Sequence, residues 1–138
     1  MFKRILLATD GSPVVERCVL YTAHLARTNQ AEVVVLHVYE LPERYASYPG
    51  YQELVEQLRA VSCALVDEVA QQLRKDGAEA RGELRIGDPS EAIILAAADY
   101  DIDLIVMGTR GSSNLSDILG SVSAHVLRHS RCPVLQIP

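Results

Sequence analysis

The sequence predicts an α/β fold: a single domain with an open five-stranded parallel sheet and helices on both faces. Two observations lead to this. Short apolar runs alternate with segments of helical periodicity along the whole chain, and most of these runs are continuously apolar. Continuous apolar strands are typical of parallel sheets covered on both sides. Strict strand–helix alternation implies right-handed crossovers between parallel strands.

Four continuous apolar runs are predicted strands: Ile5–Ala8, Val33–Val38, Leu104–Met107 and Val134–Ile137. A fifth run, Glu79–Ile86, instead alternates between apolar and charged residues. Such alternation predicts a half-exposed strand at the edge of the sheet.

The first helix has an apolar face from Val15 to Ala26. Ser12 is its expected N-cap and Pro13 its expected first helical residue. The second helix has its apolar face between Leu54 and Leu73.

A basic last turn followed by a glycine, Lys75-Asp76-Gly77, predicts the end of the second helix. Asp88-Pro89 predicts the start of the third helix, with Glu91 placed for a capping box. The last helix is expected from Gly120-Ser121 to about Arg128–Ser130.

Length, charge and cysteine content exclude several classes of protein. The 138 residues fit one domain, 1–138, and the net charge of -5 opposes general attraction to nucleic acid. No apolar run approaches the roughly 20 residues that cross a bilayer. Three cysteines without a CxxC motif argue against a disulfide scaffold or a cysteine-ligated metal. We expect a cytoplasmic protein that binds neither nucleic acid nor membrane.

Ligands of open parallel sheets bind beyond the carboxyl ends of the strands, where the strand order reverses. Two loops at such ends have suitable chemistry. One is residues 8–13, after the first strand, and the other is residues 107–114, which continue to Gly120 and Ser123.

The second loop carries the stronger signal for an anion. Gly108 and Gly111 allow a tight turn and a close backbone approach. The helix that opens at Gly120-Ser121 presents unpaired amides, Ser121 and Ser123 add hydroxyl donors, and Arg110 adds positive charge. A nucleotide phosphate chain fits this chemistry. A glycine turn with a serine N-cap, serving the fold alone, fits the same spacing.

Asp10 has two interpretations: a cap for the turn into the first helix, which its position favours, or an acceptor for a base or ribose. The backbone of Val38, at the end of the second strand, is placed to receive an adenine edge. The segment Glu40–Gln52, with three tyrosines, is either a flap over a ligand or a connection that covers the sheet edge.

The histidines do not predict a metal site. His125 and His129 are four residues apart, but no acid or third ligand accompanies them. We interpret His129 as a partner of the helix dipole and His37 as a hydrogen-bonded core histidine. Cys132, before Pro133, is expected to pack at the entry to the last strand.

Several catalytic and nucleotide-binding motifs are absent from the sequence: GxxxxGK[ST], GxGxxG after the first strand, and GxSxG. The acids of a phosphoaccepting receiver domain are also missing. We therefore expect no dedicated enzyme.

Four segments resemble the small, single-domain type of universal stress protein: ILLATDGSP, VVVLHVYE, RIGDPSEAI and DLIVMGTRG…LGSVSAHVLRHSRCPVLQI. The resemblance implies a Rossmann-like sheet of order 3-2-1-4-5, similar to that of the adenine nucleotide alpha hydrolases. It also implies a homodimer formed through the last strand, Val134–Ile137.

The family contains members that bind ATP and members that do not. Gly108, Gly111 and Gly120-Ser121 match the glycines and serine of the ATP-binding pattern, but the eight residues from Ser112 to Leu119 are one fewer than in that pattern. If the irregular part of the loop absorbs the deletion, the phosphate site survives.

By resemblance, the chain is an ATP-binding stress-response regulator, with any Mg²⁺ brought by the nucleotide and at most slow ATP hydrolysis. The alternative is a universal stress protein that binds no nucleotide and acts through protein contacts; adenylyl transfer is a third, less favoured class. The resemblance implies that the adenine and ribose lie at Ala8, Thr9, Asp10 and the Val38 backbone, and the phosphates at Gly108, Gly111, Gly120, Ser121, Val122 and Ser123. Arg110 is added from its charge and place.

Overall fold

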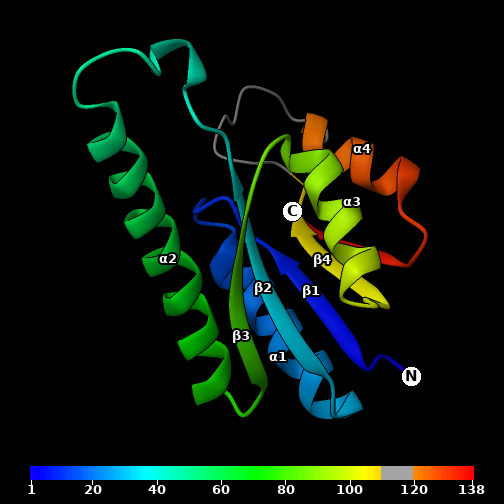
Figure 1. The fold of residues 1–138 in the computed structure, drawn as a ribbon. Helices are drawn as coiled ribbons and strands as arrows, with labels where there is room; N and C mark the ends of the chain where they lie inside the picture. Colours follow the sequence, from blue (N-terminus) through cyan, green and yellow to red (C-terminus); the bar gives the residue numbers. More distant parts are fainter. Residues whose placement is uncertain (110–119) are drawn as a thin grey trace.

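A computed structural model of the chain describes residues 1–109 and 120–138 (Figure 1). Strands and helices alternate along these residues. In chain order they are β1 (Arg4–Ala8), α1 (Val15–Asn29), β2 (Glu32–Tyr39), the 3-10 turn Glu43–Tyr45, α2 (Tyr51–Lys75), β3 (Glu79–Ile86), α3 (Pro89–Asp99), β4 (Leu104–Gly108), α4 (Ser121–His129) and β5 (Val134–Ile137).

The five strands form one parallel sheet in the order β3-β2-β1-β4-β5. This confirms the predicted fold class and strand order. β3 is an edge strand, as its alternating sequence predicted, and no residue of it is fully buried. β5 forms the other edge.

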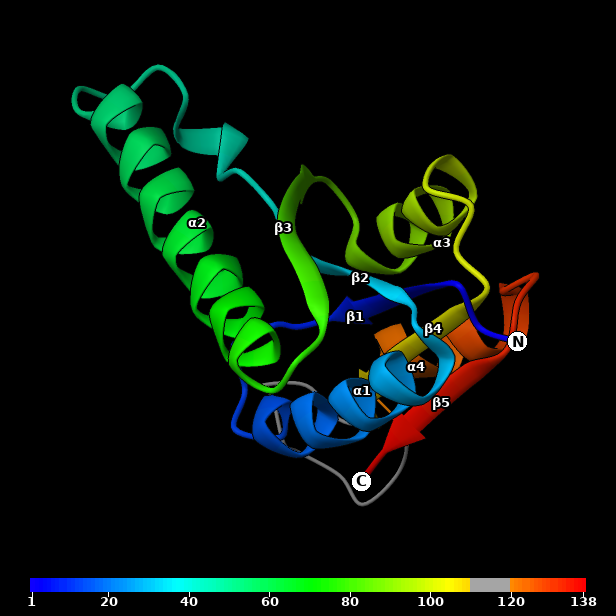
Figure 2. The ribbon, with the colours of Figure 1, turned by 90° about the horizontal axis from the view of Figure 1, so that it is seen from below.

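The sheet has a hydrophobic core on each face. On one face, Ile5 and Leu7 of β1 pack with Cys18 of α1. Val66 and Leu73 of α2 belong to the same core. On the other, Leu6 packs with Ile93 of α3 and Val126 of α4. Figure 2 shows α1 and α3 on opposite sides of β1 and β2. The continuous apolar runs therefore arise because each central strand is covered twice.

Gly82, in the middle of β3, lets α2 approach the sheet closely. A Cβ at this position would lie 2.7 Å from Cγ2 of Val66, and Val66 is only 3% exposed. Because real Cβ atoms do not approach a neighbour so closely, a larger residue at Gly82 would push α2 away.

The predicted start of α1 is wrong. The helix begins at Val15, its N-cap is Val14, and no side chain caps its amides. Instead, the chain turns at Gly11, whose φ is +83°. A Cβ at this position would lie 2.9 Å from Cδ1 of Leu65, so the turn also packs closely against α2. The sequence did not reveal that this tight turn, rather than a Ser12 cap, joins β1 to the helix.

The predicted C-terminal end of α2 and the predicted start of α3 are confirmed. α2 ends at Lys75, and Gly77 follows in the left-handed region at φ +90°. Asp88 is the N-cap of α3, and its carboxylate accepts the Glu91 amide at 3.1 Å, with Pro89 in the first turn. The Ser90 hydroxyl and the Glu91 amide hold the pKa of Asp88 below its ordinary value.

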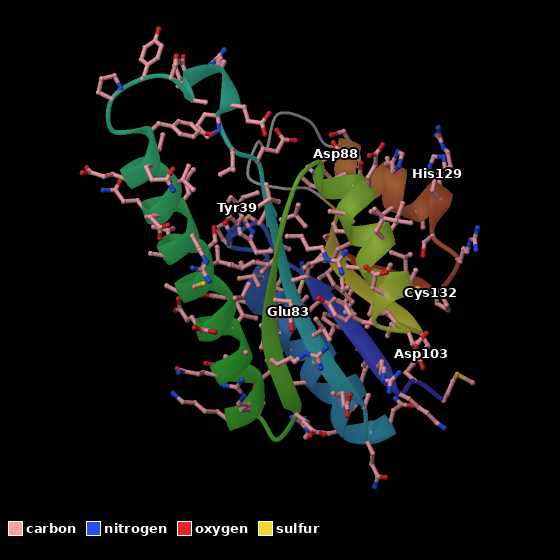
Figure 3. All side chains as sticks on the ribbon, in the orientation of Figure 1. Tyr39, Glu83, Asp88, Asp103, His129 and Cys132 are labelled. Atoms are coloured by element: carbon pink, nitrogen blue, oxygen red, sulfur yellow. The ribbon has the colours of Figure 1, made fainter. Side chains whose placement is uncertain are left out.

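Within residues 1–109 and 120–138, no helix combines the length and the apolar character that crossing a membrane needs. Figure 3 shows Asp88 at the carboxyl end of the sheet and Asp103 at the opposite end. The Asp103 carboxylate accepts the backbone amides of Lys3 and Arg4 at 2.8 and 3.2 Å. The amino end of the chain is thereby fixed at the start of β4.

Candidate functional site

A cavity of about 290 Å³ opens at the carboxyl ends of β1 and β4. These adjacent strands lead to helices on opposite faces of the sheet, α1 and α4. The cavity therefore lies at the topological switch point, where open parallel sheets bind their ligands.

The structure brings most of the predicted site residues together around this cavity. Those that line it are Ala8, Thr9, Asp10, Val38, Gly108, Gly120, Ser121, Val122 and Ser123. The other two, Arg110 and Gly111, lie outside the described residues, as does the one-residue deletion between Gly111 and Gly120.

Sequence reasoning missed the apolar part of the lining and one polar residue. The missed residues are Ser12, Val14, Val15, Cys18, Leu36, Pro89, Ile93 and Met107. They come from four separate elements and the turn before α1. The sequence predicted no role for Val14 and Ile93 and only structural roles for the others, because periodicity alone does not show which core positions border an opening.

The turn after β1 forms a polar wall of the cavity. Asp10 accepts the Ser12 amide at 2.9 Å through Oδ1, and Thr9 Oγ1 accepts the Gly11 amide at 3.2 Å. This arrangement supports the cap interpretation of Asp10, in which its side chain orders the local backbone. Nδ1 of His37 lies 2.8 Å from the carbonyl oxygen of Thr9, so this ring fixes the turn from β2.

The start of α4 forms a second polar wall. Gly120 is its N-cap in extended geometry, and no side chain caps the helix. The first intrahelical bond is donated by Ala124 to the Gly120 carbonyl at 2.9 Å. Among the described residues, the amides of Ser121, Val122 and Ser123 thus have no partner, as at any uncapped helix start. With the helix dipole, they favour an anion in the cavity.

Hydrogen bonds join the two ends of the glycine-rich loop. The Gly120 amide donates to the Thr109 carbonyl at 2.8 Å, and the Ser123 hydroxyl contacts the Thr109 and Gly120 carbonyls at 2.6 and 3.0 Å. Since a serine hydroxyl has one proton, Ser123 has only its backbone amide to offer an anion. Gln136 of β5 donates to the Ser123 carbonyl at 2.8 Å and fixes the same turn.

The remaining lining is mostly apolar and lacks basic side chains among the described residues. Asp10 is its one charged group there, and Cys18 contributes a thiol that is 1% exposed. Burial raises the pKa of Cys18 to about 11, so the thiol stays protonated at neutral pH. Leu36, Val38 and Met107 make part of the lining apolar, and the start of α4 favours an anion.

The other histidines and the cysteines agree with their structural interpretations. Nδ1 of His129 lies 3.0 Å from the His125 carbonyl in the last turn of α4. Cys132 packs against the core beside α3. Within the described part of the chain, no three histidine, cysteine or acidic residues gather as metal ligands would.

The tyrosine-bearing segment after β2 does not reach the cavity. Tyr45 and Tyr48 pack edge to face, with ring centroids 5.4 Å apart, and are 40% and 61% exposed. Neither residue lines the cavity. In this structure the segment is a connection rather than a flap.

Known proteins match the chain along its whole length. The model of the universal stress protein family matches residues 1–138. A universal stress protein of Thermus aquaticus is 37% identical over 145 residues, covering 99% of both chains. The solved structure of the hypothetical protein MJ0577, from Methanocaldococcus jannaschii, has a TM-score of 0.88 and 30% identity, covering 99% of this chain and 96% of that one.

Similar solved structures include nucleotide complexes. One of these is the universal stress protein from Archaeoglobus fulgidus in complex with dAMP, with a TM-score of 0.73 and 26% identity, covering 99% of this chain and 98% of that chain. The match of the family model from the first residue to the last, together with the strand order and the cavity at the switch point, identifies the chain as a member of the universal stress protein family.

Proposed function

We propose that this protein binds an adenine nucleotide, ATP, in the cavity between β1 and β4 and acts as a nucleotide-dependent regulator in a stress response. One observation carries the proposal: an apolar slot and an uncapped helix N-terminus line the same cavity at the switch point of the sheet. The dAMP complex of the Archaeoglobus fulgidus relative supports it.

The lining suggests how the nucleotide is oriented. The adenine lies between apolar residues, with its edge at the backbone of Val38, and the ribose lies at Thr9 and Asp10. The phosphates meet the amides of Ser121, Val122 and Ser123, whose helix dipole favours negative charge. Gly108 and Gly120 border the phosphate path, to which Gly111 and the charge of Arg110 are expected to contribute.

We propose a binding protein rather than a dedicated enzyme. Attack on the terminal phosphate needs a group that orients or deprotonates water. Among the described lining residues the titratable side chains are Asp10, whose Oδ1 accepts the Ser12 amide, and Cys18, whose pKa is about 11. We therefore expect at most slow ATP hydrolysis, with Mg²⁺ carried in by the nucleotide.

The subunit arrangement proposed here is a homodimer through β5, in the cytoplasm. Among residues 1–109 and 120–138, β5 pairs only with β4, so its outer edge offers backbone groups that a second copy of the strand can satisfy.

The first experiment is to denature the purified protein and identify any released nucleotide by chromatography and mass. Protein without bound nucleotide is then titrated with ATP and Mg²⁺ by calorimetry. Close to one adenine nucleotide per chain is the expected result. If neither route gives binding, the shortened loop has removed the nucleotide site, and the alternative function through protein contacts takes its place.

A further inference from the structure

Two buried hydroxyl groups have no hydrogen-bond partner among the described residues, Ser12 Oγ and Thr22 Oγ1. The two residues are 6% and 0% exposed. A buried hydroxyl without a partner costs folding free energy, so each calls for an explanation. They differ in one respect: Ser12 lines the cavity, whereas Thr22 lies within α1, away from it.

The side chain of Ser12 has no evident role in the fold. Its backbone already holds the turn, because its amide donates to Asp10 Oδ1 at 2.9 Å and its carbonyl accepts the Val15 amide at 3.1 Å. It does not cap α1, whose N-cap is Val14 and which has no side-chain cap. Ser12 therefore lines the cavity while its buried hydroxyl has no partner among the described residues.

We propose that Ser12 is a ligand-binding residue, whose hydroxyl donates a hydrogen bond to an oxygen in the sugar–phosphate part of the bound nucleotide. The inference rests on the proposed function and adds a contact to it. Ser12 belongs to the turn that also contributes Thr9 and Asp10, on the polar side of the cavity. Ribose and phosphate oxygens are hydrogen-bond acceptors, so they can accept the hydrogen bond that this hydroxyl donates to no described residue.

An unpaired donor increases the net gain in affinity from this contact. Most binding-site hydroxyls give up a bond within the protein or to solvent when the ligand arrives, which reduces the net gain. The Ser12 hydroxyl gives up no such bond within the described residues, and it is held in place by the turn. A ligand lacking an acceptor at this point leaves the donor buried and unpaired.

The test compares the wild type with Ser12→Ala and with a matched control, Thr22→Val, which removes the other unpaired hydroxyl. Calorimetry with ATP and Mg²⁺ should show about tenfold weaker binding by Ser12→Ala, because a lost bond to a charged group has roughly this effect. Thr22→Val should bind like the wild type. Thermal melting of free Ser12→Ala should occur at or above the wild-type temperature, since no bond within the fold is lost.

Unchanged ATP affinity in Ser12→Ala, or a lower melting temperature of the free variant, overturns the proposal and makes Ser12 a structural residue. Titration with AMP and adenosine locates the acceptor: a loss seen with AMP alone points to a phosphate oxygen, and a loss with both points to the ribose. Absence of binding by the wild type would instead overturn the proposed function itself, and the Ser12 contact with it.

Discussion

Cys18 shows how one residue serves both the core and the cavity. It lies on the inner face of α1, packs in the core beneath β1 and borders the cavity. Its burial raises the pKa of the thiol to about 11 from the ordinary 9.0. Helical periodicity predicted only a packing role for Cys18. In the structure it also lines the cavity, and its thiol is uncharged at neutral pH.

This pKa predicts a loss of stability at alkaline pH. Below pH 9 the thiol is protonated in both states, so the contribution of Cys18 to stability is fully present. Between pH 9 and 11 the unfolded chain loses the proton first, and stability falls by up to about 3 kcal/mol. Urea unfolding of the wild type and Cys18→Ala should show their difference constant from pH 7 to 8.5 and shrinking above pH 9. Parallel pH profiles would contradict the raised pKa.

Two helices, α3 and α4, begin at the same end of the sheet, but only the amides of α3 are capped by the side chain of the N-cap residue. Asp88 caps α3 with its carboxylate, whereas α4 begins at Gly120 without a side-chain cap. Both helices contribute lining residues, Pro89 from α3 and Ser121 to Ser123 from α4. Leaving one N-terminus uncapped costs stability but leaves amides that favour an anion, and the proposed nucleotide site rests most on this feature.

Closing this N-terminus with a side chain should separate stability from binding. In Gly120→Asp, the extended backbone of residue 120 (φ -63°, ψ 160°) suits an N-cap aspartate, which would accept an amide of the first turn. Compared with the control Gly120→Ala, we expect about 1 kcal/mol more stability by urea unfolding. ATP affinity should be at least about tenfold lower in calorimetry, because the carboxylate accepts a hydrogen bond from the first-turn amides and its negative charge repels the phosphates. Equal ATP affinity in the two variants would remove α4 from the phosphate site.

At the scale of the whole molecule, β5 is an edge strand that, within the described part of the chain, has a neighbouring strand on one side, β4. The Pro133 carbonyl accepts the amide of Ile105 in β4 at 3.0 Å, and the Ile137 carbonyl accepts the amide of Thr109, just after β4, at 2.9 Å. Because backbone groups alternate along a strand, those of Val134 and Gln136 point away from β4, to the open edge. A second β5 strand can use these groups.

Gln136→Pro should therefore weaken the dimer, because it removes an outward amide while leaving the bonds to β4. Its side chain also holds the Ser123 carbonyl, so Gln136→Ala is the matched control, which loses that contact and keeps the amide. Light scattering across a dilution series should show dissociation of the proline variant at higher concentrations than the control. A proline variant that dimerises like Gln136→Ala would place the interface elsewhere.

The strands, the end of α2 and the start of α3 were predictable because they depend on local patterns, whereas the order of the strands in the sheet was predicted from the family resemblance. Apolar runs, the alternation of β3, the Asp88 cap and the left-handed Gly77 each act within a few residues. The start of α1 was not predictable in this way. There the turn at Gly11 packs against Leu65, more than fifty residues along the chain, and that distant contact overrides the local Ser-Pro signal.

The sequence by itself determined the family and the identity of the polar residues at the ends of β1 and β4, because motifs and short-range patterns record them. Only the tertiary structure decided which of those groups are free to bind. The Ser123 hydroxyl is used within the fold, while the Ser12 hydroxyl and the first amides of α4 have no partner among the residues that the structure describes. The physical reason is that hydrogen-bond partners and burial depend on residues far apart in the chain, and folding alone brings those residues together.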